Sequence, residues 1–103
     1  MLTPRGWLLL YHGVQPGTVV GVYRTFYAYL NATDPSVVVE MDDTTPVLES
    51  RPELTEFLKE LSYLTGVVFT TGVVEDGDDL IVASGEDDLA CRITRIPKAR
   101  FGL

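Results

Sequence analysis

The sequence predicts an all-β fold of antiparallel strands, and three observations support this prediction. Residues 65–96 alternate apolar runs, rich in Val, Ile, Thr and Phe, with short acidic turns, as consecutive antiparallel strands do. Asp76-Gly77 lies between two of these runs. Asp-Gly is a strong hairpin signal, because a type I′ turn needs positive φ at both central residues. The chain also lacks the alternation of strands and helices that βαβ units require.

The elements of the first half follow from local composition. A short apolar strand, buried on both faces, is expected first, and a loop rich in Gly and Pro follows it. The next strand is long, and its aromatic residues disturb the alternation, which indicates a bulge. A further strand follows a polar turn, and two more residues extend the chain before its character changes. These segments are in order Trp7 to Tyr11, His12 to Gly17, Thr18 to Leu30, Val37 to Met41, and Val47-Leu48.

One short helix is expected near residues 52–64. Leu54, Phe57, Leu58 and Leu61 recur at i, i+3, i+4 and i+7, the spacing of one helix face, and Pro52 suits a first helical turn. We expect this apolar stripe to pack into the core. Strands over residues 67–74, 80–83 and 89–96 follow, separated by acidic turns at 75–79 and 85–88. The pattern fits a sandwich, a barrel or a propeller.

Composition limits the class of protein. A chain of 103 residues forms one small domain at most. Its net charge of −7 argues against nucleic acid and anionic membranes as partners, since both select Lys and Arg. No stretch approaches the roughly 20 apolar residues needed to span a bilayer. The one cysteine, Cys91, cannot form an internal disulfide, so a cytoplasmic location is expected, and we expect this thiol in the core.

The residues alone leave the chemistry open. His12, the only histidine, lies where a strand meets a loop, so it is either functional or hydrogen-bonded at a strand end. The cluster Glu75 to Asp79 lacks the ligand spacing of a calcium loop and favours a solvated turn. Glu86, Asp87 and Asp88 are either paired carboxylates for glycoside chemistry or a second acidic turn. No metal site is expected, because no second His or Cys supports one.

Read as a whole, the chain resembles the C-terminal part of glycoside hydrolase family 130, the β-mannoside phosphorylases and related glycosidases. The stretch 6–14, Gly-Trp-Leu-Leu-Leu-Tyr-His-Gly-Val, is similar to a motif of that family. Residues 67–74 resemble the family's Val-Val-Phe-Pro-Thr-Gly run, and residues 85–88 fall on its Gly-Ala-Ala-Asp corner. Further similar segments keep the same order, namely Tyr23-Arg24, Asp34-Pro35-Ser36 and Pro46-Val47-Leu48-Glu49.

The resemblance implies a five-bladed β-propeller, of which residues 1–103 would be a single partial domain of about two blades. It implies that His12 and Tyr23 contact inorganic phosphate, a co-substrate, and that Asp88 binds the sugar at the cleavage point. It assigns no catalytic residue here, because the family's general-acid aspartate and most of its phosphate-binding arginines lie in the N-terminal half. Gly66 replaces a family asparagine, and the segment between Glu49 and Val67 is longer, so mannoside specificity stays open.

Two hypotheses follow. In the first, the chain is part of a glycosidase or phosphorylase that acts on oligosaccharides, with no activity of its own. In the second, it is a non-catalytic β module that self-associates or completes a partner's propeller by edge pairing, since isolated blades leave strand edges and an apolar side uncovered.

Overall fold

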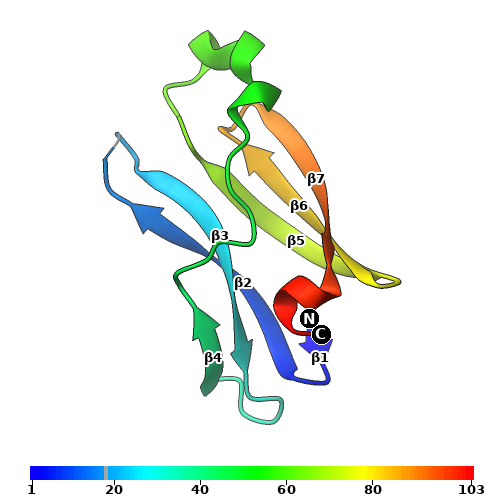
Figure 1. Ribbon diagram of the computed structural model, residues 1–103. Coiled ribbons are helices and arrows are strands. Elements are labelled where there is room, and N and C mark those ends of the chain that lie inside the picture. Colours follow the sequence, from blue (N-terminus) through cyan, green and yellow to red (C-terminus); the bar gives the residue numbers. More distant parts are fainter. Residues whose placement is uncertain (18) are drawn as a thin grey trace.

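The computed structural model describes residues 1–17 and 19–103, which form two antiparallel sheets joined by a long connection (Figure 1). Sheet A has the strand order β1-β2-β3-β4 and sheet B the order β5-β6-β7. Three short 3-10 helices complete the chain. The bounds of sheet A are β1 Leu2–Thr3, β2 Gly6–Gln15, β3 Val22–Leu30 and β4 Val38–Asp42; those of sheet B are β5 Val68–Asp76, β6 Asp79–Glu86 and β7 Ala90–Pro97; the helices are η1 Pro52–Leu54, η2 Glu56–Leu61 and η3 Lys98–Phe101.

The predicted fold class is confirmed. Both sheets are antiparallel meanders in which each strand pairs with its neighbour in sequence, an arrangement consistent with propeller blades. The bulge expected in the long aromatic strand is present as a register shift between Tyr29 and Leu30. Thr18, the first residue of the predicted strand, lies outside the described residues.

Strand β2 is longer than predicted and includes His12, which the sequence had placed in a loop. It continues to Gln15 because β3 supplies a partner for every residue from Trp7 onwards, ending with the pair Gln15↔Val22. Glycine suits position 13 of this strand because there is no room for a side chain: a Cβ there would lie 2.5 Å from the ring of Phe26. The prediction of burial on both faces was wrong, since Trp7 and Leu9 are exposed and Leu8 is buried.

The β5-β6-β7 meander is confirmed, with one difference in its first turn. Asp76 pairs with Asp79, so Gly77 and Asp78 are the two central residues. Of these only Gly77 has positive φ, at 59°, whereas a type I′ turn needs it at both. Glycine at the first central position is the signature of type II′, the other turn that matches strand twist.

The segment near residues 52–64 is helical, as two 3-10 helices. Its apolar stripe does not enter the core, so that prediction was wrong: Phe57 is 82% and Leu61 74% exposed. A 3-10 helix has three residues per turn, so residues spaced for an α-helix do not share one face. Neither helix has a side-chain cap at its start.

The core lies between the inner faces of the two sheets. Tyr27 and Tyr29 of sheet A pack with Leu80 and Val82 of sheet B, and Phe101 of η3 completes the cluster. The Tyr29 hydroxyl donates a buried hydrogen bond to the Phe101 carbonyl at 2.8 Å. The core is therefore assembled from residues distributed over the whole chain.

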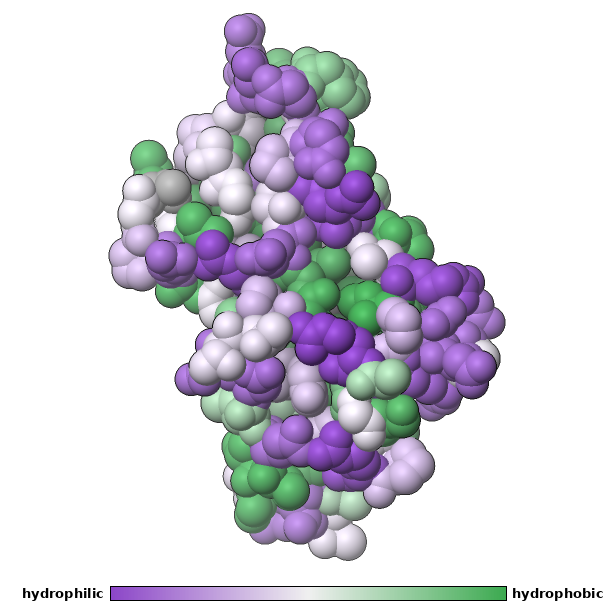
Figure 2. Space-filling view, in the orientation of Figure 1, coloured by the Kyte–Doolittle hydropathy of each residue, from purple (hydrophilic) through white to green (hydrophobic). Residues whose placement is uncertain are grey.

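Several apolar side chains remain at the surface. Figure 2 shows an apolar group at the lower end of the molecule, where β4 lies in Figure 1 and where Val37, Val38 and Val39 are exposed. Cys91 is exposed on β7, so its predicted place in the core was wrong. None of the helices in the described part of the chain has the length and apolar character needed to span a bilayer.

Candidate functional site

His12 lies on the inner face of β2, opposite Thr25 of β3. Its Nε2 atom accepts a hydrogen bond from the backbone N–H of Thr70 in β5, at 2.8 Å. The imidazole stacks on the ring of Phe69, with 4.3 Å between centroids and 30° between planes. Burial lowers the pKa of His12 below its ordinary value. The ring is therefore neutral near pH 7, and Nδ1–H is its remaining donor.

This geometry predicts how His12 titrates. We expect its pKa in the folded chain to lie below about 6.5, the ordinary value. An unfolded chain then binds the proton at higher pH, so the stability that neutral His12 contributes is complete above about pH 6.5 and is lost as pH falls through the folded pKa. NMR can measure this directly, because the chain has one histidine and hence one set of imidazole signals. A folded pKa above 6.5 would contradict the hydrogen bond from Thr70, and His12→Gln should remove this part of the pH dependence.

Tyr23 and Asp88 line the same hollow of about 280 Å³, together with Val67 and Phe69. The Tyr23 and His12 rings are tilted neighbours, with 6.4 Å between centroids. The three residues that the sequence resemblance selected therefore lie around one place where the two sheets meet. Sequence reasoning missed Phe69, which joins His12 to the hollow. The available signal was an aromatic residue in a run otherwise rich in Val and Thr.

The backbone around Asp88 is held by its neighbour Asp87. The Asp87 carboxylate accepts a hydrogen bond from the Val67 N–H at 2.8 Å, and the Asp87 N–H donates to the Val67 carbonyl at 2.9 Å. Asp87 and Asp88 have φ values of 50° and 57°, a region that Asp tolerates better than most residues. The corner thus fixes the exposed Asp88 beside the start of β5.

Glu86 is fully buried at the same corner. Its carboxylate accepts hydrogen bonds from the Ser50 hydroxyl at 3.0 Å, the Arg92 guanidinium at 3.3 Å and the Arg51 N–H. Arg92 also donates to the Glu49 carbonyl at 2.7 Å. Glu86 and Asp87 therefore hold the backbone of this corner, which favours the acidic turn over paired catalytic carboxylates among residues 86–88.

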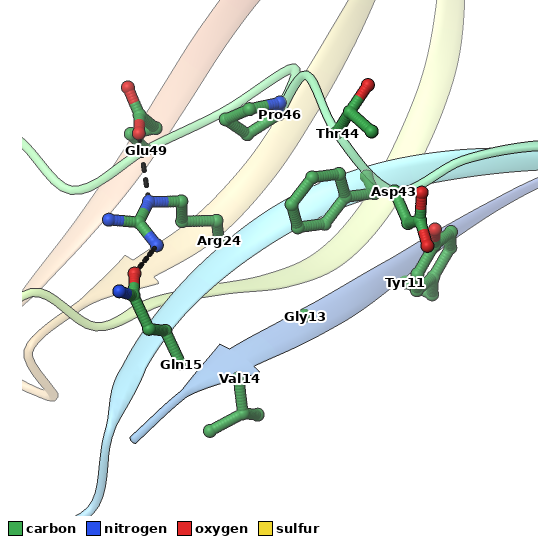
Figure 3. A pocket seen from close by; sticks show the side chains of 10 residues that line it. Tyr11, Gly13, Val14, Gln15, Arg24, Asp43, Thr44, Pro46 and Glu49 are labelled. Atoms are coloured by element: carbon green, nitrogen blue, oxygen red, sulfur yellow. Dashed lines mark hydrogen bonds and ion pairs between the residues drawn. The ribbon is translucent and has the colours of Figure 1, made fainter. Parts of the chain in front are cut away.

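A second hollow, of about 460 Å³, lies on the opposite face of sheet A, and Figure 3 shows the residues around it. Arg24 lies between Glu49 and Gln15, donating to them at 2.9 and 2.7 Å. Burial, together with the charges of Asp43 and Asp42, raises the pKa of the nearby Tyr11. Because Tyr23 and Arg24 are consecutive in a strand, they point to opposite faces, so this hollow is separate from the one beside His12.

The acidic turn at 75–79 is a hairpin turn, as the sequence favoured, and Arg95 pairs with Asp76 and Asp79 across it. Among the residues that the structure describes, no group of three or more His, Cys, Asp or Glu side chains is arranged to hold a metal ion.

Comparison with known proteins gives two similar sequences, whereas no protein-family model matches the chain. The chain is 38% identical over 95 residues to a beta-1,2-mannobiose phosphorylase of Thermoanaerobacter sp. (strain X514), a match that covers 92% of this chain and 29% of that protein. It is 34% identical over 86 residues to a beta-1,2-mannobiose phosphorylase of Listeria innocua, covering 84% of this chain and 22% of that protein. The chain therefore spans less than a third of each relative, and over most of its own length its resemblance to the phosphorylases of glycoside hydrolase family 130 is confirmed.

Proposed function

We propose that the chain supplies part of the sugar- and phosphate-binding site of a glycoside phosphorylase or related glycosidase, with β-1,2-mannobiose as the substrate class. One observation carries the proposal: Tyr23 and Asp88, distant in sequence, line one hollow beside His12. The similarity to two beta-1,2-mannobiose phosphorylases supports it. The chain would act in the cytoplasm and would take its remaining site residues from the other parts of a complete enzyme.

Each side chain suits its proposed role. The exposed carboxylate of Asp88 accepts hydrogen bonds from sugar hydroxyls, and hydrogen bonds to a charged group contribute about 1.5–3 kcal/mol. Tyr23 and the Nδ1–H of His12 can donate to phosphate oxygens. Phe69, 48% exposed, offers an apolar surface beside them. None of these residues is assigned as the general acid.

In the complete enzyme, phosphate or water would attack the anomeric carbon while the glycosidic bond breaks. An aspartic acid outside residues 1–103 would protonate the leaving oxygen. His12, Tyr23 and Asp88 would bind and orient the reactants. Because the acid lies elsewhere, we propose that this chain alone has no activity.

The binding site can be tested on the chain itself by NMR titration with β-1,2-mannobiose and, separately, with inorganic phosphate. We expect signals of residues 12, 23, 69 and 88 to shift, and we expect Asp88→Asn to weaken sugar binding about tenfold, which corresponds to about 1.4 kcal/mol. Asp78→Asn, in the exposed hairpin turn, is the matched control and should bind as the parent does. Shifts confined to other residues, or equal binding by both variants, would refute the site.

A second candidate is a non-catalytic module that completes the propeller of a partner. The outer edge of β7 favours it, because β7 pairs with no further strand among the described residues and sheet B has three strands where sheet A has four. Failure of both ligands to bind, with the chain folded, would favour this candidate over the first.

A further inference from the structure

His12 belongs to a closed set of contacts that joins the two sheets. It lies directly opposite Thr25, on the neighbouring strand β3. The hydroxyl oxygens of Thr25 and Thr70 are 2.7 Å apart, a hydrogen bond between sheet A and sheet B. The backbone N–H of Thr70 returns to His12 and donates to Nε2 at 2.8 Å. Thr70 therefore contacts both His12 and the residue opposite it.

The Thr70 N–H can reach His12 because of where β5 lies. Strand β5 is at the edge of sheet B, on the side that faces β3 (Figure 1). An edge N–H that points away from its own sheet has no acceptor in the ladder, and burying it without a partner is costly. The pairing of β5 with β6 is also irregular here, with a register shift between Thr70 and Gly72, and such bulges are common beside functional sites. The imidazole supplies the acceptor that the edge of β5 lacks at this point.

The surroundings leave the imidazole little freedom to turn. Thr25 is fully buried, and its N–H and carbonyl are bonded to the backbone of Leu48 and Val47 at 2.9 and 2.8 Å. This anchored residue fixes the position of the Thr70 side chain through the hydroxyl pair. The face of the imidazole stacks on Phe69. The ring is therefore held by one edge and by one face.

The contact with Thr70 decides which imidazole nitrogen carries the proton. A ring nitrogen that accepts an N–H must be unprotonated, so the neutral ring carries its proton on Nδ1. Burial lowers the pKa of His12, and the hydrogen bond acts in the same direction, because only unprotonated Nε2 can accept it. The other titratable side chains described at this hollow are Tyr23 of β3 and Asp88, which follows β6. His12 is thereby a donor of fixed direction.

We propose that Thr70 is the positioning residue of this site: its N–H holds His12 in the Nδ1–H tautomer, so that Nδ1–H is the proton offered to an oxyanion such as inorganic phosphate. This inference rests on the proposed function, which gives the His12 donor its ligand. In the family run Val-Val-Phe-Pro-Thr-Gly, proline stands at the position of Thr70, and proline has no N–H. A chain with that proline cannot make this contact, and one substitution removes it here.

The test compares the ¹⁵N-labelled parent chain with three variants by NMR. Thr70→Pro removes the N–H, and an edge strand accepts proline where the N–H takes no part in the ladder. Thr70→Val is the matched control because it removes only the hydroxyl group, and Thr70→Ser keeps both groups. We expect the imidazole ¹⁵N shifts to show the Nδ1–H tautomer alone in the parent, Thr70→Val and Thr70→Ser. In Thr70→Pro we expect a mixture with the Nε2–H form in the majority and a His12 pKa closer to about 6.5.

Phosphate binding connects the tautomer to the site. At about pH 8, where the ring is neutral, we expect inorganic phosphate to bind Thr70→Pro about fivefold more weakly than the parent, the usual effect of one hydrogen bond. Thr70→Val should bind as the parent does. A Thr70→Pro chain that keeps the single tautomer overturns the proposal, and so does one that changes tautomer but binds phosphate like the parent.

Two further results are decided in advance. A parent that binds no phosphate refutes the proposed function, and the imidazole spectra still show whether Thr70 sets the tautomer. If circular dichroism shows that Thr70→Pro is unfolded, the parent decides: ¹⁵N–¹⁵N coupling through the hydrogen bond from Thr70 to Nε2, with one tautomer, supports the proposal. Absence of that coupling overturns it.

Discussion

Glu86→Ala is expected to lower the free energy of unfolding by about 3–5 kcal/mol, the usual effect of removing one partner of a buried ion pair. Glu86 is fully buried and the Arg92 side chain is 10% exposed, so the remaining guanidinium would have little water to replace its partner. The Ser50 hydroxyl and the Arg51 N–H would also lose their acceptor. Since small domains are stable by about 5–15 kcal/mol, this loss should be visible as a large fall in the urea midpoint.

Glu53→Ala is the matched control, because Glu53 pairs with Arg51 at 2.9 Å where both side chains are more than half exposed. Exposed pairs contribute little, so its urea midpoint should stay close to that of the parent. Replacing Glu86 and Arg92 together by Leu should recover part of the loss, since no unpaired charge remains. Equal midpoints for Glu86→Ala and Glu53→Ala would show that water reaches the Glu86 carboxylate.

Phe101→Ala is expected to cost about 3–5 kcal/mol, the range for removing a buried phenylalanine ring. Phe101 is fully buried, and its ring meets Tyr27 edge to face, with 5.5 Å between centroids. The substitution leaves a cavity between the sheets and loosens η3, whose carbonyl at Phe101 accepts the Tyr29 hydroxyl. Urea unfolding followed by tyrosine fluorescence measures the loss.

Phe57→Ala provides a control with the same chemical change at an exposed position. We expect its free energy of unfolding to equal that of the parent within error, because the Phe57 ring already lies in water. A loss comparable to that of Phe101→Ala would mean that η2 packs on the core, as the spacing of its apolar residues suggested.

The parts of the fold that the sequence predicts well are those set by neighbouring residues. The β5-β6-β7 meander follows from apolar runs and from glycine in a turn, both of which are local. The apolar spacing near Phe57 suits an α-helix and a buried face, so the predicted helix period was wrong. The segment forms 3-10 helices, and the Phe57 side chain stays exposed. Phe101 had no local signal at all, since its burial depends on tyrosines 72 and more positions away.

The candidate site was likewise predicted in part, and the rest depends on contacts between residues distant in sequence. His12, Tyr23 and Asp88 were selected by resemblance, and the structure places them around one region between the sheets. Composition could not show that the Glu86 and Asp87 carboxylates accept hydrogen bonds that hold the backbone of the corner, whereas Asp88 is exposed to solvent. That difference depends on which carboxylates meet Arg92 and Val67, residues that approach only after the chain folds.

The hydrogen bonds that end at Phe101 also set how the chain reaches its native state. One joins Tyr29 to Phe101, 72 positions apart, and another joins Arg5 to Phe101, 96 positions apart. Closing loops of this length lowers the chain entropy before the contacts that offset this cost have formed. For this reason β proteins with many distant contacts fold in milliseconds to seconds. During synthesis, sheet A can form its hairpins early, but its aromatic inner face is covered only after sheet B and Phe101 have been made.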